Sequence, residues 1–104
     1  MSQEALFDKP ARSAGRHELE LEKTIGLARA AGVVEELDAA LISLARALAW
    51  SLDAAEAEGK PYAVAQSAAP FRETLDALKL TPVARAAEQD SELAKALAEL
   101  AEVE

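Results

Sequence analysis

The stretch VEELDAALISLARALAWSLDAAEAEG, residues 34–59, decides the fold class of this chain. One apolar row within it recurs at intervals of three and four residues, as one face of an α-helix does, and consists of Val34, Leu37, Leu41, Leu44 and Leu48. A second row widens this face and consists of Ile42, Ala45 and Ala49. We therefore expect a helix over residues 34–58 that ends at Gly59 and packs against more than one neighbour.

The charges of this predicted helix match its dipole only at the start. The early acids Glu35, Glu36 and Asp38 suit the positive end of the dipole. The late acids Asp53, Glu56 and Glu58 lie near the negative end, where the dipole does not favour them.

The composition of the 104 residues favours helix along the whole chain. Hydrophobic residues make up 51%, mainly alanine and leucine, whereas aromatic residues make up 4% and β-branched residues are few. The length suits one domain. We expect an all-α fold, a small helical bundle of about four helices with a long central helical hairpin. Because alanine buries little area, we also expect other subunits to supply part of the stability, as in an oligomer.

Glycine and proline divide the chain into segments. Residues 1–15 show no apolar periodicity and are predicted to be a flexible N-terminal arm. Residues 16–104 are predicted to form a single helical oligomerisation domain. Its expected helices cover residues 16–31, 34–58, 61–79 and 82–102, and the third is expected to be kinked or briefly broken near Pro70.

The stretch LKLTPVARAAE, residues 78–88, predicts the start of the last helix. The Thr81 hydroxyl can cap the first turn, and Pro82 suits the first helical position because its missing amide would be unpaired there. An apolar row with one polar interruption follows with heptad spacing and is expected to pack along a new axis: Val83, Ala86, Asp90, Leu93, Leu97 and Leu100.

The net charge of −8 makes a single copy of this chain a poor candidate for binding nucleic acid. Residues 1–29, however, hold five of the 11 Lys and Arg residues against five acids. DNA contact would have to come from a local patch that is repeated around an assembly. Such a patch could include His17, and the predicted contact residues are Arg12, Arg16, Lys23 and Arg29.

The sequence offers no recognisable catalytic or metal-binding motif. It has no cysteine, and its one histidine, His17, lacks a second imidazole with which to complete a zinc site. The serines lack a GxSxG context, and the four glycines are too far apart to form a phosphate-binding loop. We expect no enzyme activity, cofactor, metal or small-molecule substrate.

No signal peptide and no apolar run of the roughly 20 residues that a membrane span needs is present in the sequence. We therefore expect a soluble cytoplasmic protein with no membrane contact. Trp50, close to the apolar row of residues 34–48, is predicted to pack in the core or at a subunit interface rather than to stack on a nucleic-acid base.

The stretch LARALAWSLDAAEAEGKPYAVAQSAAPFRETLDALKLTPVARA, residues 44–86, resembles the small subunit of phage or prophage terminases. Members of that family end a helical segment with a Leu-Gly-Leu-Thr-Pro-Ala-Ala-Arg type of sequence. The matching residues here are Leu78, Leu80, Thr81, Pro82, Ala84 and Arg85. Lys79 replaces the usual glycine and Val83 the usual alanine. Because a side chain disfavours a left-handed backbone, we expect this turn to be reached differently here.

The resemblance implies a non-enzymatic DNA-packaging factor in the cytoplasm of a bacterial host. Such subunits form rings, recognise double-stranded viral DNA and regulate the large terminase subunit. Many carry an N-terminal helix-turn-helix, but the residues before Val34 hold only one convincing helix. Residues expected at an oligomer interface or hinge are Trp50, Thr81, Pro82, Arg85, Leu93, Leu97 and Leu100. The alternative, which explains the acidity better, is a helical interaction or adaptor module that does not bind DNA.

Overall fold

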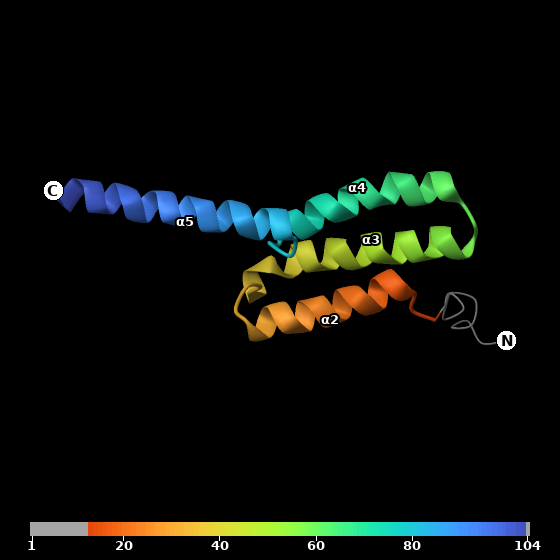
Figure 1. Ribbon diagram of the computed structural model, residues 1–104. Helices are drawn as coiled ribbons and strands as arrows, with labels where there is room; N and C mark the ends of the chain where they lie inside the picture. Colours follow the sequence, from red (N-terminus) through yellow and green to blue (C-terminus); the bar gives the residue numbers. More distant parts are fainter. Residues whose placement is uncertain (1–12, 104) are drawn as a thin grey trace.

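The computed structural model describes residues 13–103, and every regular element in this range is helical. Labelled as in Figure 1, the elements are α2 (Arg16–Ala30), the 3₁₀ helix η1 (Glu36–Asp38), α3 (Ala39–Ala57), α4 (Pro61–Ala77) and α5 (Pro82–Val103). The predicted all-α class is therefore confirmed for the described residues. None of their helices is long and apolar enough to cross a membrane. Most of the expected N-terminal arm lies outside the described range.

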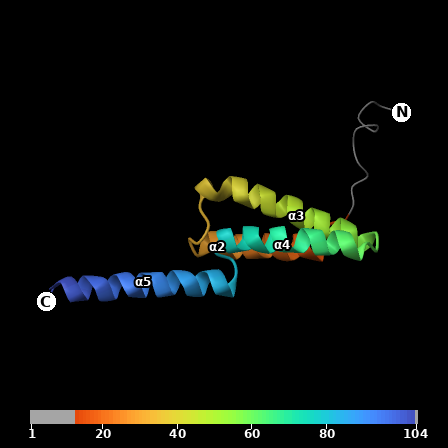
Figure 2. The same cartoon turned by 90° about the horizontal axis from the view of Figure 1, so that it is seen from above.

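The three helices α2, α3 and α4 pack together, and α5 projects from them. α3 lies between α2 and α4 and is antiparallel to both (Figure 1). Viewed from above, α4 lies over α2, and α3 lies to one side of both helices (Figure 2). α5 extends beyond this three-helix unit, and the molecule measures 76 × 30 × 17 Å. The expected bundle of about four helices is thus a three-helix unit with one projecting helix.

The core is built on the second of the two apolar rows in α3. Ile42, Ala45 and Ala49 are almost completely buried, together with Leu52. The first row is divided: Val34 is buried and Leu41 packs against the core, whereas Leu37 is 92% exposed and Leu44 is 49% exposed. Helical spacing defines the faces of a helix but not which face its neighbours cover. Ala45 and Ala49 are small enough to let both α2 and α4 come near α3, and Ile42 and Leu52 are buried beside them.

α3 also begins five residues later than expected. The Glu35 amide donates to Asp38 Oδ2 at 2.9 Å, and the Asp38 amide donates to the Glu35 carbonyl at 3.0 Å. These two bonds close the 3₁₀ turn η1 ahead of Ala39. Leu37 therefore lies in a turn and not on the α-helix.

A kink or a short break was expected near Pro70, and α4 continues through this residue without a break. The missing proline amide would have bonded to the carbonyl of Gln66, and both residues are exposed, so water can solvate that carbonyl. The buried Thr74 donates its hydroxyl to the Pro70 carbonyl at 2.8 Å, which gives this turn another bond.

Three helices end in the same Schellman motif. In each one, the amide two positions beyond the cap residue bonds to a carbonyl five residues back. The bonds are Val33 to Ala28 at 2.9 Å, Lys60 to Ala55 at 2.9 Å, and Leu80 to Leu75 at 2.9 Å. The left-handed residue in these motifs is Gly32, Gly59 and Lys79, with φ values of 74°, 66° and 63°.

Lys79 therefore adopts the conformation that its side chain disfavours. The expectation that this turn would be reached differently is wrong. The neighbouring Leu75, Leu78 and Leu80 all pack in or against the core, and this packing holds the turn in the glycine-like conformation.

Thr81 joins α4 to α5 as the sequence predicts. Its hydroxyl accepts a hydrogen bond from the Ala84 amide at 3.2 Å and donates one to the Asp76 carboxylate of α4. Pro82 is the first residue of α5. The apolar row beyond it does not pack within the chain, since Val83 and the three leucines of α5 are 58–76% exposed.

Replacing Lys79 with glycine should stabilise the protein. Glycine reaches a positive φ without a steric penalty, so we expect the free energy of unfolding to rise by about 1 kcal/mol. The melting temperature should rise by roughly 4–8 °C, as measured by circular dichroism.

Gly59→Lys is the matched control, because nothing lies within 4 Å of a Cβ added at Gly59. It should destabilise the protein by a similar amount through the backbone alone. If Lys79→Gly lowers the melting temperature, the left-handed conformation at residue 79 is not a source of strain.

Candidate functional site

A charged cluster joins the start of α2 to the end of α3. Asp53 of α3 is 4% exposed, and its carboxylate oxygens accept hydrogen bonds from the backbone amides of His17 at 3.0 Å and Glu18 at 2.9 Å. The first amides of a helix have no acceptor within that helix, and the positive end of its dipole favours a carboxylate. Asp53 therefore caps α2 from a different helix.

Gly15 makes this capping contact possible. A Cβ atom added at Gly15 would lie 2.3 Å from Cγ of Asp53, which is too close for any side chain. The Gly15 amide donates to Oε2 of Glu18 at 2.8 Å, so a second carboxylate bonds a free amide of the same turn. Gly15 supplies space, and Asp53 supplies the acceptor that a capping side chain at residue 15 would otherwise provide.

Glu56 lies one turn beyond Asp53 and binds two side chains of α2, those of Arg16 and His17. The Arg16 guanidinium donates to both carboxylate oxygens, at 3.2 and 2.6 Å, and Nε2 of His17 lies 2.6 Å from Oε1. The hydrogen bond from Arg16 lowers the pKa of the Glu56 carboxyl, and the same bond raises the pKa of Arg16. Because the Arg16 side chain is 74% exposed, water screens this pair and it contributes little stability.

The same cluster is the one place in the described residues where three potential metal ligands converge. Ligand atoms of His17, Asp53 and Glu56 lie within 4.8 Å of one another. Asp53, however, already accepts bonds from two backbone amides, and Glu56 binds Arg16 and His17. We therefore assign the cluster a structural role.

The sequence gives no direct sign that His17 contacts Asp53 and Glu56. These acids lie 36 or more residues further along the chain, and no local pattern links them to α2. The available signal was their position in the last turns of α3, where the helix dipole does not favour acids. An acid that opposes its own helix dipole can be serving the start of another helix.

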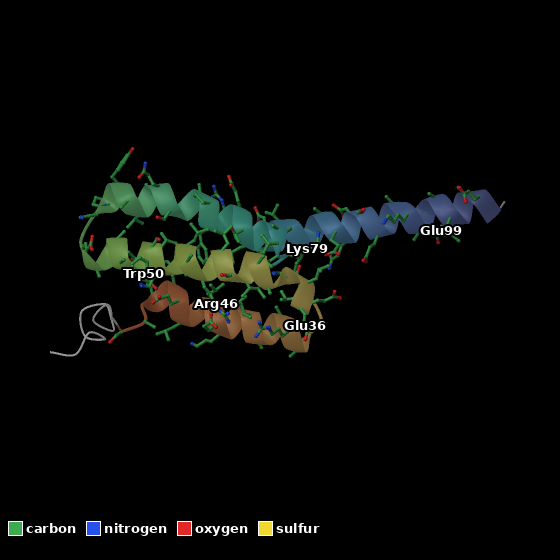
Figure 3. All side chains as sticks on the ribbon, turned by 180° about the vertical axis from the view of Figure 1, so that it is seen from behind. Glu36, Arg46, Trp50, Lys79 and Glu99 are labelled. Carbon is green, nitrogen blue, oxygen red and sulfur yellow. The ribbon has the colours of Figure 1, made fainter. Side chains whose placement is uncertain are left out.

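A second ion pair joins the middle of α2 to α3. Arg46 donates to both oxygens of Glu22, at 2.9 and 2.8 Å, and this bond lowers the pKa of Glu22 and raises that of Arg46. Figure 3 shows Arg46 extending from α3 across α2. Arg46 is the one Lys or Arg residue of α3 and is bound to Glu22, and Asp53 is buried. Arg46 and Asp53 therefore contribute no free charge to the outward surface of α3.

Three of the four predicted DNA-contact residues lie on α2 in the described part of the chain, and two of these are bound to acids. Arg12 lies outside the described residues. Arg16 is bound to Glu56, and Nζ of Lys23 lies 3.2 Å from Oε1 of Glu20. Arg29 is exposed in the last turn of α2. α2 as a whole carries as many acids as Lys and Arg residues, so a single copy presents no net positive charge along it.

The residues predicted for an oligomer interface or hinge separate into three groups. Thr81 and Pro82 lie where α4 is joined to α5, and Figure 3 labels Lys79 at this junction. Arg85 is exposed in the first turns of α5. Trp50 is 46% exposed on α3. The remaining residues form one exposed row along α5: Leu93, Leu97 and Leu100.

A family model described as terminase small subunit matches residues 21–103, from the middle of α2 to the end of α5. The chain belongs to the terminase small subunit family. No curated protein and no solved structure matches the chain. The resemblance of residues 44–86 is thereby confirmed, and membership assigns this terminase small subunit to viral DNA packaging. The matched range contains the whole of α3, α4 and α5 but begins after Arg16.

Replacing Asp53 with alanine should destabilise this terminase small subunit by about 2 kcal/mol, because two first-turn amides lose a charged acceptor. Asp53→Asn, which keeps one oxygen acceptor, should cost less. Chemical denaturation measures both. The control is Glu73→Ala on the exposed surface of α4, which should change stability by less than about 0.5 kcal/mol.

Gly15→Ala should also destabilise the wild-type protein, since the added methyl group meets Asp53. In the Asp53→Ala background that clash is absent, so the two effects should be far from additive. Fully additive losses would show that Gly15 and Asp53 do not form the contact described.

Proposed function

We propose that this terminase small subunit is a non-enzymatic packaging factor that assembles from several copies, binds viral DNA and regulates the large terminase subunit. The observation that carries the proposal is the projecting helix α5, which lies inside the family-matched range. Its apolar row is uncovered in the described part of the chain. The family is generally non-catalytic, which agrees with this role.

The case for self-assembly rests on the exposure of α5. Leu93, Leu97 and Leu100 lie on one face of a 22-residue helix that touches the rest of the chain only near its start. Helical stability in proteins comes mostly from packing an apolar face, and contiguous exposed apolar surface marks an interaction site. A helix of this kind suits an assembly in which other copies cover the leucines.

The case for DNA contact rests on repetition. Arg16, Lys23 and Arg29 are exposed on α2, with Arg12 preceding the described residues. One copy offers few cations, but several copies arranged around one duplex would present the set many times, and weak contacts add through effective concentration. Phosphate contacts of this kind give salt-dependent binding.

A helical adaptor without DNA binding is the second candidate. Two of the predicted DNA-contact residues are bound to carboxylates, and the chain has a net charge of −8. Both observations favour a surface that meets proteins rather than phosphates.

A gel-shift titration with phage DNA that contains the packaging region tests the DNA role. One variant carries Arg12, Arg16, Lys23 and Arg29 changed to alanine. A matched control removes four cations elsewhere, namely Lys60, Arg72, Lys79 and Lys95, so the net charge changes equally. We expect the first variant to bind at least about tenfold more weakly than the control at moderate salt.

Native mass spectrometry of the same samples reports how many copies assemble. Several copies together with DNA binding support the packaging role. Assembly without any DNA shift supports the adaptor, and equal weakening in the two variants would show that binding depends on overall charge alone.

A further inference from the structure

The outward face of α3 is free of unpaired charge. Among its exposed residues the only charged one is Arg46, which is bound to Glu22. The positions on this side recur at intervals of three and four and are small or apolar. Ala40, Ser43, Leu44 and Ala47 are exposed, and Ser51 and Ala54 continue the row as half-buried residues. In a chain with 29% charged residues, a full helix face without free charge needs an explanation.

We propose that α5 of one copy of the protein packs along this outward face of α3 in another copy. The inference rests on the self-assembly proposed above and adds the two surfaces that meet. The α5 leucines and the first two turns of the α3 face are exposed in the described chain, and the two surfaces belong to helices of similar length. α3 has 19 residues and α5 has 22, which correspond to about 28 and 33 Å.

The two faces are complementary in size. α5 presents leucines at residues 93, 97 and 100, whereas α3 presents alanine at residues 40, 47 and 54, one every seven positions. Small residues let two helices approach closely and leave the holes into which larger side chains insert. Pairing α5 with another α5 would instead place leucine rows against each other.

Asp90 further favours α3 as the partner. This carboxylate interrupts the apolar row of α5, and in a parallel, in-register pair of α5 helices it would face the same carboxylate of the other copy. Like charges in a buried seam are destabilising. The α3 face instead offers two hydroxyl donors, Ser43 and Ser51, so Asp90 can be hydrogen-bonded there.

α5 cannot make this contact within its own chain. It runs away from the three-helix unit, in the direction that α4 has set, and lies well to one side of α3 (Figures 1 and 2). An α5 helix that packs on the α3 face must therefore belong to another copy. Because each copy has one α5 and one open α3 face, each can engage two neighbours, and such head-to-tail contacts close into a ring when the rotation allows.

Disulfide cross-linking tests the pairing directly, because the natural chain has no cysteine. One set of proteins carries a single cysteine on α3, at Ala40, Ala47 or Ala54. A second set carries one on α5, at Leu93, Leu97 or Leu100. Each α3 protein is mixed with each α5 protein and oxidised mildly. At least one mixed pair should cross-link at several times the yield of its two homodimers, since a disulfide needs Cβ atoms about 3.5–4.5 Å apart.

Glu92→Cys and Glu99→Cys are the controls on the polar side of α5 and should give little mixed product with Ala47→Cys. Dominant α5 homodimers, or no mixed product in a protein that native mass spectrometry shows to be assembled, would overturn the pairing and leave the proposed function intact. A wild-type protein that stays monomeric would overturn both.

A charge on the α3 face provides a second test that keeps the fold. Ala47→Glu places a carboxylate at an exposed helical position, so the circular dichroism spectrum should not change, while the assembly should fall to single copies. Ala69→Glu, on the exposed side of α4, should leave the assembly intact. Assembly that survives Ala47→Glu would contradict the proposed contact.

Discussion

The position of α2 depends on a carboxylate that belongs to another helix. Asp53 accepts hydrogen bonds from two free amides in the first turn of α2, and Gly15 lets that carboxylate come within bonding distance. This contact fixes where α2 starts relative to the end of α3, so that Leu21, Ile25 and Ala28 meet the alanine row of α3. Because α2 and α4 both lie against that row, the opposite side of α3 faces outward in the three-helix unit.

The high alanine content explains why a single copy leaves much apolar surface exposed. Ala45 and Ala49 have no exposed surface and let both neighbours approach α3, but they bury little area. The larger side chains Leu37 and Leu44 remain largely at the surface, and the leucines of α5 have no neighbour in the described chain. A single copy therefore leaves apolar surface exposed on two helices, which is the property expected of a subunit rather than of a self-sufficient domain.

Much of the fold could be predicted from local chemistry. Gly32, Gly59 and the Thr81–Pro82 pair mark helix ends or starts because their effect acts within a few residues. The orientation of α3 could not be predicted, because two adjacent apolar rows satisfy the same helical spacing. The left-handed conformation of Lys79 could not be predicted from the sequence. A lysine side chain disfavours this conformation, but the packing of the neighbouring leucines imposes it. Asp53 was missed because its partners are 35 and 36 residues away, beyond the reach of any local pattern.

The family of the chain and its contact with DNA rest on different kinds of observation. Family membership follows from the match over residues 21–103. The proposed DNA contact would depend on cations that are spread along α2 and are partly bound to acids. The physical claim at the centre is that α5 is stable because another copy covers it. Hydrogen exchange of the full chain at two concentrations tests this claim. The α5 amides should be protected to the same degree as those of α3 when the protein is concentrated and should lose protection on dilution. α5 amides that exchange at one rate at every concentration would contradict it.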